Sequence, residues 1–268
     1  MALYTANLDS TVETFKSFLK DRLKQVSQTP KIALIAGVDD KSADINPIVK
    51  ILEELNIQYS FRTFQNGEEA ISYIEELNED KSVHAILVNK ESFGEKRQDI
   101  VNKIAPLKDV GLDSEFNKSV FFSNFVSTSP KMWAIRVILE TNGYATFTPY
   151  NCAVLGIHPE CFEIMHYLNK KGATSMLVRP YTRELQKLVQ LADIVIVNDV
   201  SMVPSNCFKE DAFIINASSP ENEFNIAPTS GSTYVNYENF YKVYCLAVAW
   251  MTLVSYLIIT REEIENDD

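Results

Sequence analysis

Short apolar segments alternate with helical patterns along almost the whole chain. Continuous apolar runs of four to seven residues are typical of strands buried on both faces of a parallel sheet. Their alternation with helices indicates right-handed βαβ units. Strands are therefore expected near 31–37, 59–64, 83–88, 152–157, 173–178, 193–198 and 212–217. Helices are expected within 10–26, 47–57, 66–80, 96–107, 128–144, 159–172 and 182–192.

The helix expected after residue 128 has clear start and stop signals and divides the series in two. Ser129 stands at the N-cap position, Pro130 at the first helical position and Gly143 at the C-cap. The predicted fold class is α/β with two lobes, each a parallel sheet between helices, and the second lobe Rossmann-like. The first lobe comprises residues 1–128 plus 236–268, and the second comprises residues 129–235. The long C-terminal helix is expected to pack back on the first lobe.

The charge of the chain limits its partners. The 268 residues carry a formal net charge of −11. Nucleic-acid backbones and anionic membranes bind clustered Lys and Arg, so neither partner is expected. Four scattered cysteines, with no CxxC spacing, favour a reducing compartment. The N-terminal segment has no apolar core typical of a secretory signal, so the protein is expected to be cytoplasmic.

A long apolar helix is predicted from about Asn236 to Ile259. The part from Val243 to Thr260 has no charged residue and approaches the length of a membrane span. Hydroxyl-bearing residues are spread around it, and no basic cluster flanks it. A buried helix between lobes or subunits is therefore favoured over a membrane anchor.

Six segments carry a resemblance to a known family by their order and spacing. They are VHAILV, IAPLKDV, SPKMWAIRVILETNG, GATSMLVRPYT, LADIVIV and NIAPTSG. The chain resembles the bifunctional methylenetetrahydrofolate dehydrogenase/methenyltetrahydrofolate cyclohydrolase family (FolD type), as a diverged member. The resemblance implies an N-terminal lobe for a folate-like small molecule, a C-terminal lobe for NADP or NAD, a cleft between the lobes, and a homodimer.

The family has a Tyr and, four residues later, a Lys at the start of the second helix, and this chain keeps at most the Lys. Counting forward from the turn GVDDKSA puts Asn46 and Lys50 at these places, whereas counting backward puts Asp44 and Ile48 there. The Tyr is absent either way. Lys50 could transfer protons if its pKa were depressed in a closed site. It lies off the apolar face of its helix, however, so a solvated lysine is favoured.

Two further substrate-binding places of the family are altered. Asn89 stands where the family has a Gln that contacts substrate, and its shorter amide could keep that hydrogen bond. A turn or cap residue is an equally good interpretation of this Asn. In APLKDVGLD, Asp109 matches the first Asp of the family's Lys-Asp-Val-Asp-Gly segment. The second Asp, which anchors the pterin, is deleted, because Gly111 follows Val110; Asp113 would need the loop to rearrange.

The cofactor motif is altered as well. Gly156 keeps the first glycine of the family's dinucleotide fingerprint, but His158 follows where an open glycine turn is expected, and it would crowd the phosphates. The family's Ser-Arg pair for a 2′-phosphate is replaced, leaving Arg179 and Arg183 as substitutes. Binding of NADP or NAD is therefore doubtful. The last glycine-rich segment keeps only Pro228 and Gly231.

A metal site is not expected. Residues 152, 158, 161 and 166 are Cys, His, Cys and His, but their spacing fits no closed zinc site. His84 lies within an expected strand and is interpreted as a hydrogen-bonded sheet residue rather than a catalytic one.

The leading functional hypothesis is a diverged relative whose standard activities are lost or much reduced. Residual chemistry would be hydride transfer from 5,10-methylenetetrahydrofolate to NAD(P) and attack of water on the methenyl product. Lys50 would then move protons and Asn89 would orient the ring, and Asp109 is a further candidate catalytic residue. The alternatives are a non-catalytic dimer that binds another ligand or partner, and an enzyme in which Arg179 and Arg183 bind a smaller anion.

Overall fold

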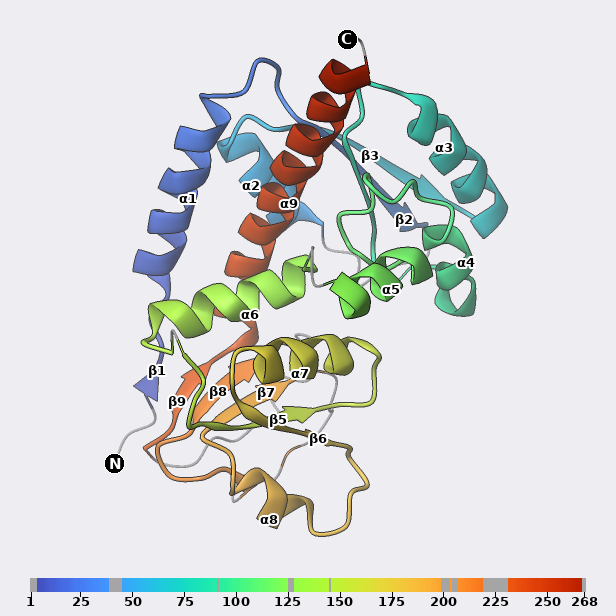
Figure 1. The fold of residues 1–268 in the computed structure, drawn as a ribbon. Helices are drawn as coiled ribbons and strands as arrows, with labels where there is room; N and C mark the ends of the chain where they lie inside the picture. The colour runs from blue at the N-terminus through green and yellow to red at the C-terminus, as the bar shows by residue number, and fades with distance from the viewer. Residues whose placement is uncertain are drawn as a thin grey trace. The chain divides into compact units, whose positions relative to one another are not determined.

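The computed structural model describes residues 4–38, 45–90, 92–124, 128–144, 146–198, 203, 207–218 and 231–266. The chain divides into two compact units (Figure 1). The six-stranded unit comprises residues 1–12 and 131–244, and the three-stranded unit comprises residues 13–130 and 245–268. Each unit is described by itself below.

The three-stranded unit has a parallel sheet with the strand order β3-β2-β4. Strand β2 (Lys31–Gly37) lies between β3 (Gln58–Phe64) and β4 (Ala85–Val88). The apolar residues of β2 and β4 are buried and pack with α3 (Gly67–Glu79) and α4 (Arg97–Val101). The unit also contains α2 (Asn46–Glu54), the 3₁₀ helix η1 (Gly94–Lys96) and α5 (Glu115–Asn124).

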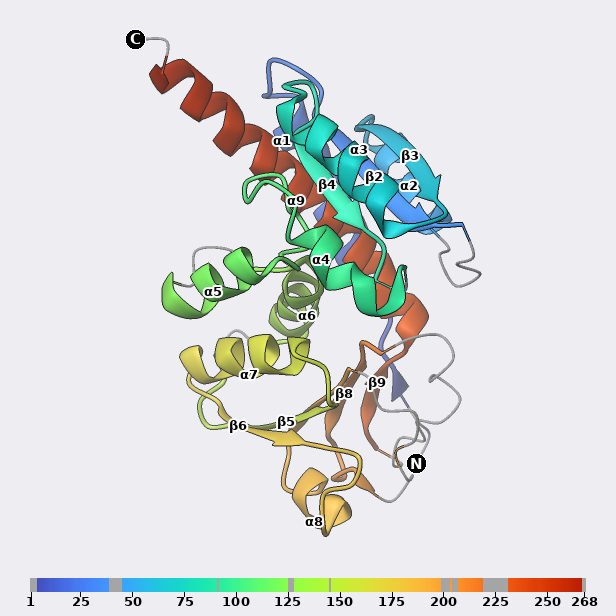
Figure 2. The same cartoon turned by 90° about the vertical axis from the view of Figure 1, so that its right-hand side faces the viewer.

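The six-stranded unit is also fully parallel, with the order β1-β9-β8-β7-β5-β6. Its strands are β1 (Tyr4–Thr5), β5 (Asn151–Leu155), β6 (Thr174–Val178), β7 (Ile194–Val197), β8 (Phe213–Asn216) and β9 (Thr233–Val235). Helices α7 (Glu160–Lys170) and α8 (Leu185–Val189) lie on opposite faces of the sheet (Figures 1 and 2). Strands β5 and β7 are buried on both faces, as their apolar runs predict. Helix α6 (Pro130–Thr141) precedes β5 in the chain.

The strand order in this unit creates a topological switch point. Counted in chain order from β5, the five principal strands are arranged 2-1-3-4-5. The connection from β5 leads to β6 on one side, whereas β7 pairs with the other side of β5. In open parallel sheets, ligands bind beyond the carboxyl ends of the strands at such a point. Here that point lies beyond Leu155 and Val197.

Two long helices contribute residues to both units. Helix α1 (Asp9–Leu23) and helix α9 (Tyr237–Asn266) each contain a boundary between the units. The second part of α9 packs in the three-stranded unit, as predicted, because Trp250 contacts Phe18 and Tyr256 contacts His84. The Tyr256 hydroxyl also accepts a hydrogen bond from the Gln28 N–H at 3.2 Å.

Helix α9 is long and apolar enough to cross a membrane by length and composition alone. Two thirds of its most apolar window, 67%, is buried inside the protein, as in the core helix of a globular fold. This degree of burial is compatible with the buried helix that the sequence favoured.

Four elements were not predicted from the sequence, among them the three-residue helix η1. Strands β1 and β9 have only two and three residues, too few to show a period. Helix α5 has little amphipathic character, but Ser114 before it accepts a hydrogen bond from the Asn117 N–H at 3.3 Å. That spacing of an N-cap serine is the sequence signal that could have revealed the helix.

Candidate functional site

Polar residues gather beyond the carboxyl ends of strands in each unit. In the three-stranded unit they form a network of Arg97, Asp109, Asp113, Ser114 and Asn117, here called the Arg97 network. In the six-stranded unit they form a cluster of Lys131, Glu160, Cys161 and Asn198, here called the Lys131 cluster. These groups are the candidate functional sites.

Asp109 is almost fully buried, at 3% exposure, and both of its oxygens are engaged. Oδ2 accepts hydrogen bonds from the Ser114 N–H at 3.0 Å and from the Asn117 side chain at 3.1 Å. Oδ1 accepts from the Asp113 N–H at 3.3 Å. Burial raises the pKa of Asp109, and the neighbouring Asp113 charge raises it further. The carboxylate thus shapes its own loop and the start of α5.

Asp113 is paired with Arg97. The Arg97 guanidinium donates to Asp113 Oδ2, and it also donates to the carbonyls of Val88 and Asn89, at 3.1 Å each. Burial by itself would raise the pKa of Asp113, but the positive charges of Lys90 and Arg97 outweigh this effect and lower it. Asp113 is therefore ionised and held against the end of β4.

Gly111 leaves room for the Asp113 carboxylate within the loop 105–113. A Cβ atom built on Gly111 would lie 2.8 Å from Asp113 Oδ2, closer than non-bonded atoms approach. A glycine is needed for this close approach. The glycine and the Arg97–Asp113 pair are thus parts of one arrangement.

Asn89 follows β4 and is partly buried. Its N–H donates to the Ile35 carbonyl at 2.8 Å, and its own carbonyl accepts from Arg97 and from the Ser92 N–H. Its backbone links the Arg97 network to the carboxyl end of β2. There the Ser92 hydroxyl accepts the Gly37 N–H at 3.0 Å.

Lys50 lies on the exposed side of α2, whereas Ile48 and Leu52 are buried. This arrangement agrees with the apolar face read from the sequence. Asn46 is the first residue of α2 and is exposed, and Asp44 lies outside the described residues. The structure does not bring Lys50 into the Arg97 network.

His84 behaves as predicted from the sequence. It is buried immediately before β4, and its Nδ1 accepts the Lys31 N–H at 3.1 Å. Its ring lies edge-on to Tyr256, with centroids 4.9 Å apart. It has a structural role in joining the sheet to α9.

The expected cofactor residues lie at the ends of β5 and β6. Gly156 is buried after β5 and donates to the Val178 carbonyl at 3.1 Å, whereas His158 is exposed. Arg179 and Arg183 are exposed and flank a turn closed by a hydrogen bond from the Thr182 N–H to the Arg179 carbonyl. Tyr181, at the tip of this turn, is 98% exposed. Pro228 lies outside the described residues.

The Lys131 cluster was not predicted from the sequence. Lys131 Nζ lies 2.6 Å from Glu160 Oε2 and donates to Asn198 Oδ1 at 2.9 Å. The Asn198 amide donates to Cys161 Sγ at 3.6 Å. Lys131 and Glu160 are largely buried, with side-chain exposures of 11% and 16%. Glu160 begins α7 after β5 and Asn198 follows β7, so the cluster lies at the switch point.

Metal ligands do not gather anywhere in the described part of the chain, where no group of three or more His, Cys, Asp or Glu side chains could hold an ion. All four cysteines are buried. Burial, and then the Asp193 charge, raises the pKa of Cys152 to about 12, so this thiol stays protonated.

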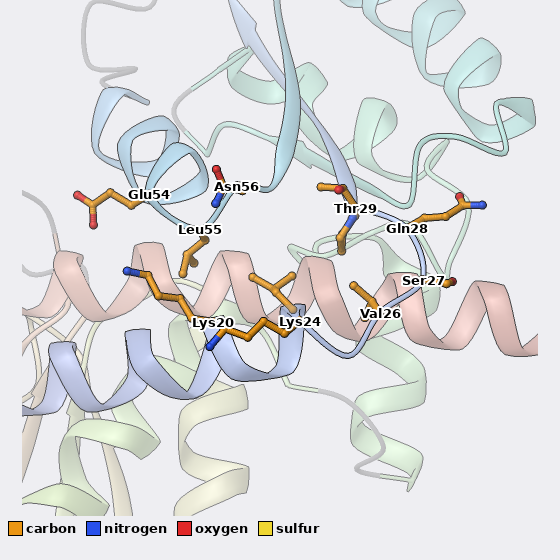
Figure 3. A pocket seen from close by; sticks show the side chains of 11 residues that line it. Lys20, Lys24, Val26, Ser27, Gln28, Thr29, Glu54, Leu55 and Asn56 are labelled. Atoms are coloured by element: carbon orange, nitrogen blue, oxygen red, sulfur yellow. The ribbon is translucent and has the colours of Figure 1, made fainter.

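A groove of about 490 Å³ lies in the three-stranded unit (Figure 3). Lys20 and Lys24 line it from α1 and the residue after its end, and Glu54 and Asn56 line it from the end of α2. Its charges are mixed, and Lys24 is paired with Asp21 at 2.9 Å. None of the site residues expected from the sequence lines this groove.

The fold and these strand-end groups define a two-unit parallel α/β protein with a Rossmann-like unit, the architecture of many nucleotide-dependent dehydrogenases. No protein-family model matches the chain. The bifunctional protein FolD of Caldanaerobacter subterraneus is 26% identical over 212 residues, which cover 75% of each chain. Human cytoplasmic C-1-tetrahydrofolate synthase is 28% identical over 74% of this chain and 23% of that protein.

Solved structures with a similar fold include enzymes of the same kind as the relatives found by sequence. The bifunctional FolD enzyme of Campylobacter jejuni superposes with a TM-score of 0.81 at 18% identity, covering 95% of this chain and 99% of that one. The NAD-dependent 5,10-methylenetetrahydrofolate dehydrogenase of Saccharomyces cerevisiae gives 0.79 at 18% identity, covering 97% and 100%. The resemblance to the FolD-type dehydrogenase/cyclohydrolase family is thus confirmed, and the low identity fits a diverged sequence.

Proposed function

We propose that this chain binds a folate-like small molecule and has lost, or retains at a much reduced level, the dehydrogenase and cyclohydrolase activities of its relatives. The engagement of Asp109 and Asp113 carries this proposal. Asp109 accepts three hydrogen bonds from its own loop, and Asp113 is paired with Arg97. Neither carboxylate is left to accept paired hydrogen bonds from the amino-pyrimidine edge of a pterin without breaking this network.

The similarity to folate enzymes supports the ligand class. The match to FolD covers 75% of the chain, and related structures are described as 5,10-methylenetetrahydrofolate dehydrogenases. The related Trypanosoma brucei enzyme was solved with NADP. For this chain we propose weak binding of NADP or NAD, with Gly156, His158, Arg179 and Arg183 as the contacts, and no metal.

Any residual turnover would follow the chemistry of the relatives. Hydride would pass from 5,10-methylenetetrahydrofolate to NAD(P), and water would attack the methenyl product, with Asn89 orienting the ring. Asp109 would take part only if its hydrogen bonds to Ser114 and Asn117 were broken. Lys50 is the candidate for proton transfer. If Lys50 is only a solvated lysine, as its exposure on α2 favours, Lys50→Ala will leave residual turnover unchanged. A loss of turnover in this variant would assign the lysine a catalytic role.

We further propose a cytoplasmic homodimer without nucleic-acid or membrane partners. The net charge of −11 and the burial of most of α9 support the second part. Light scattering after size-exclusion chromatography should give twice the mass of the chain.

The deciding experiment combines turnover with thermal unfolding. Purified protein is assayed for both reactions and is melted with a folate analogue at millimolar concentration. Ligand at one hundred times its Kd stabilises the folded state by about 2.7 kcal/mol, which raises Tm measurably. We expect stabilisation by the folate analogue with no turnover above background. Turnover of about 1 s⁻¹ or more, the ordinary enzymatic range, would contradict the proposed loss of activity.

The alternative function predicts a different result in the melting experiment. If the protein is a non-catalytic dimer for another ligand or partner, the folate analogue will leave Tm unchanged while the dimer persists. The engagement of Asp109 and Asp113 in an internal network is compatible with this alternative. The melting experiment therefore separates the two functions.

A further inference from the structure

The switch point of the six-stranded unit is filled by the protein's own ion pair. It lies where β5 and β7 end, and the residues beyond these ends include Glu160 and Asn198. In parallel sheets of this order, an anionic ligand binds here, against the N-terminus of the helix after the first strand. In this chain Lys131 Nζ contacts Glu160 Oε2 at 2.6 Å and Asn198 Oδ1 at 2.9 Å instead.

The first turn of α7 has few N–H groups left for a ligand. The Cys161 N–H donates to the His158 carbonyl, and the Phe162 N–H donates to the Pro159 carbonyl, at 3.0 Å each. In an ordinary α-helix these N–H groups lack an internal partner and can bind a phosphate. The connection from β5 to α7 has only four residues, from Gly156 to Pro159, which leaves little backbone to wrap a diphosphate.

The carboxylate of Glu160 also supplies the negative charge that this helix end favours. A negative group in the first turn interacts favourably with the partial positive charge of the helix N-terminus. Lys131 and Asn198 hold that group in a largely buried position. A phosphate entering here would meet a fixed like charge, and it would have to separate a buried ion pair.

We propose that Glu160, held by Lys131 and Asn198, is a specificity-determining residue that excludes the phosphates of dinucleotides from the switch point. Removing this carboxylate converts the Lys131 ammonium into a group that binds an external anion. The inference rests on the proposed function only in treating the six-stranded unit as the nucleotide unit. It explains the expected weakness of NADP and NAD binding by a defined pair of residues.

The test measures binding of inorganic pyrophosphate and of NADP by calorimetry, using the full-length chain. We expect wild type to bind both only weakly, with Kd values above about 1 mM. Glu160→Ala should bind pyrophosphate at least about tenfold more tightly than wild type. Glu163→Ala removes a carboxylate from the same turn of α7, outside the Lys131 cluster, and should bind like wild type. Adding Lys131→Met to Glu160→Ala should abolish the gain.

Three results would overturn the inference. The first is tight binding of pyrophosphate or NADP by wild type. The second is an equal increase in pyrophosphate affinity in Glu163→Ala, and the third is an increase that persists when Lys131 is also replaced. Glu160→Gln preserves size and hydrogen bonding, and it takes the place of Glu160→Ala if that variant fails to fold. The folate analogue provides an independent reference. If it stabilises none of these proteins, the proposed folate function is wrong. The difference in pyrophosphate affinity between wild type and Glu160→Ala still decides the role of Glu160.

Discussion

Arg97 satisfies several groups at the end of β4 with one side chain. It donates to the carbonyls of Val88 and Asn89 and to the Asp113 carboxylate. Arginine suits this position because its planar guanidinium presents several donors in a fixed geometry. The loop 105–113 is therefore held by an internal charge pair, with side-chain exposures of 15% and 11%.

Replacing Asp113 by Asn should lower the free energy of unfolding at neutral pH by about 3 kcal/mol, because Arg97 would keep a buried charge without its carboxylate partner. The pKa of Asp113 is lowered in the folded state. Its stabilising contribution is therefore present above its ordinary pKa and is lost as the pH falls through the lowered value. The difference between wild type and variant should shrink on acidification, as measured by urea unfolding from about pH 7 to about pH 3.

Asp109→Asn is the control for this pH dependence. The pKa of Asp109 is raised in the folded state, so the native protein binds that proton more tightly than the unfolded chain. The Asp109 contribution to stability decreases as the pH rises above its ordinary pKa, opposite in sign to that of Asp113. The Asp109→Asn difference should not shrink on acidification. A pH-independent effect of Asp113→Asn would count against the assigned ion pair.

At the scale of elements, Lys108 closes the end of α3. Its ammonium donates to the carbonyls of Leu77 and Asn78 at 2.8 Å and of Asp80 at 2.9 Å. The last carbonyls of a helix lack internal partners, and a positive charge there also suits the helix dipole. The loop 105–113 is thereby tied to α3 as well as to α5.

Replacing Lys108 by Met should destabilise the fold by about 2 kcal/mol, because buried carbonyls would lose their donors. Urea unfolding of Lys108→Met measures the loss. Lys103→Met, at an exposed position of the same segment, should change the free energy of unfolding by less than about 0.5 kcal/mol. Equal effects of the two substitutions would contradict the capping role of Lys108.

The sequence predicted the elements that have a strong local pattern. β2, β4, β5 and β7 are continuous apolar runs because both of their faces are buried, and Ser129, Pro130 and Gly143 mark α6 by local backbone preferences. The Lys131 cluster has no such pattern, since its pairs are separated by 29 and 67 residues in the chain. Its geometry depends on strand order, which periodicity does not specify.

At the scale of the whole molecule, the boundary between the units falls inside two helices. Helix α1 changes unit after Val12, and α9 changes unit after Tyr244. A helix propagates its hydrogen bonds cooperatively, so unfolding of one unit should fray helical turns that belong to the other.

We therefore expect a single calorimetric transition on heating, with the calorimetric enthalpy equal to the van't Hoff enthalpy. Inserting two glycines after Tyr244 should weaken this coupling and broaden or divide the transition, whereas the same insertion in the exposed turn near Lys81 should not. Two well-separated transitions in the unmodified protein would show that the shared helices do not couple the units.

The loop 105–113 also bears on association between chains. Strand β4 ends the smaller sheet on one side, and such an edge can pair with a strand of another molecule and start aggregation. Here Asp109 forms a parallel bridge with Ile86, and the Ile86 N–H donates to the Lys108 carbonyl at 2.6 Å. The loop therefore covers an edge that could otherwise pair with another molecule, so it protects the protein against aggregation whether or not it also binds a ligand.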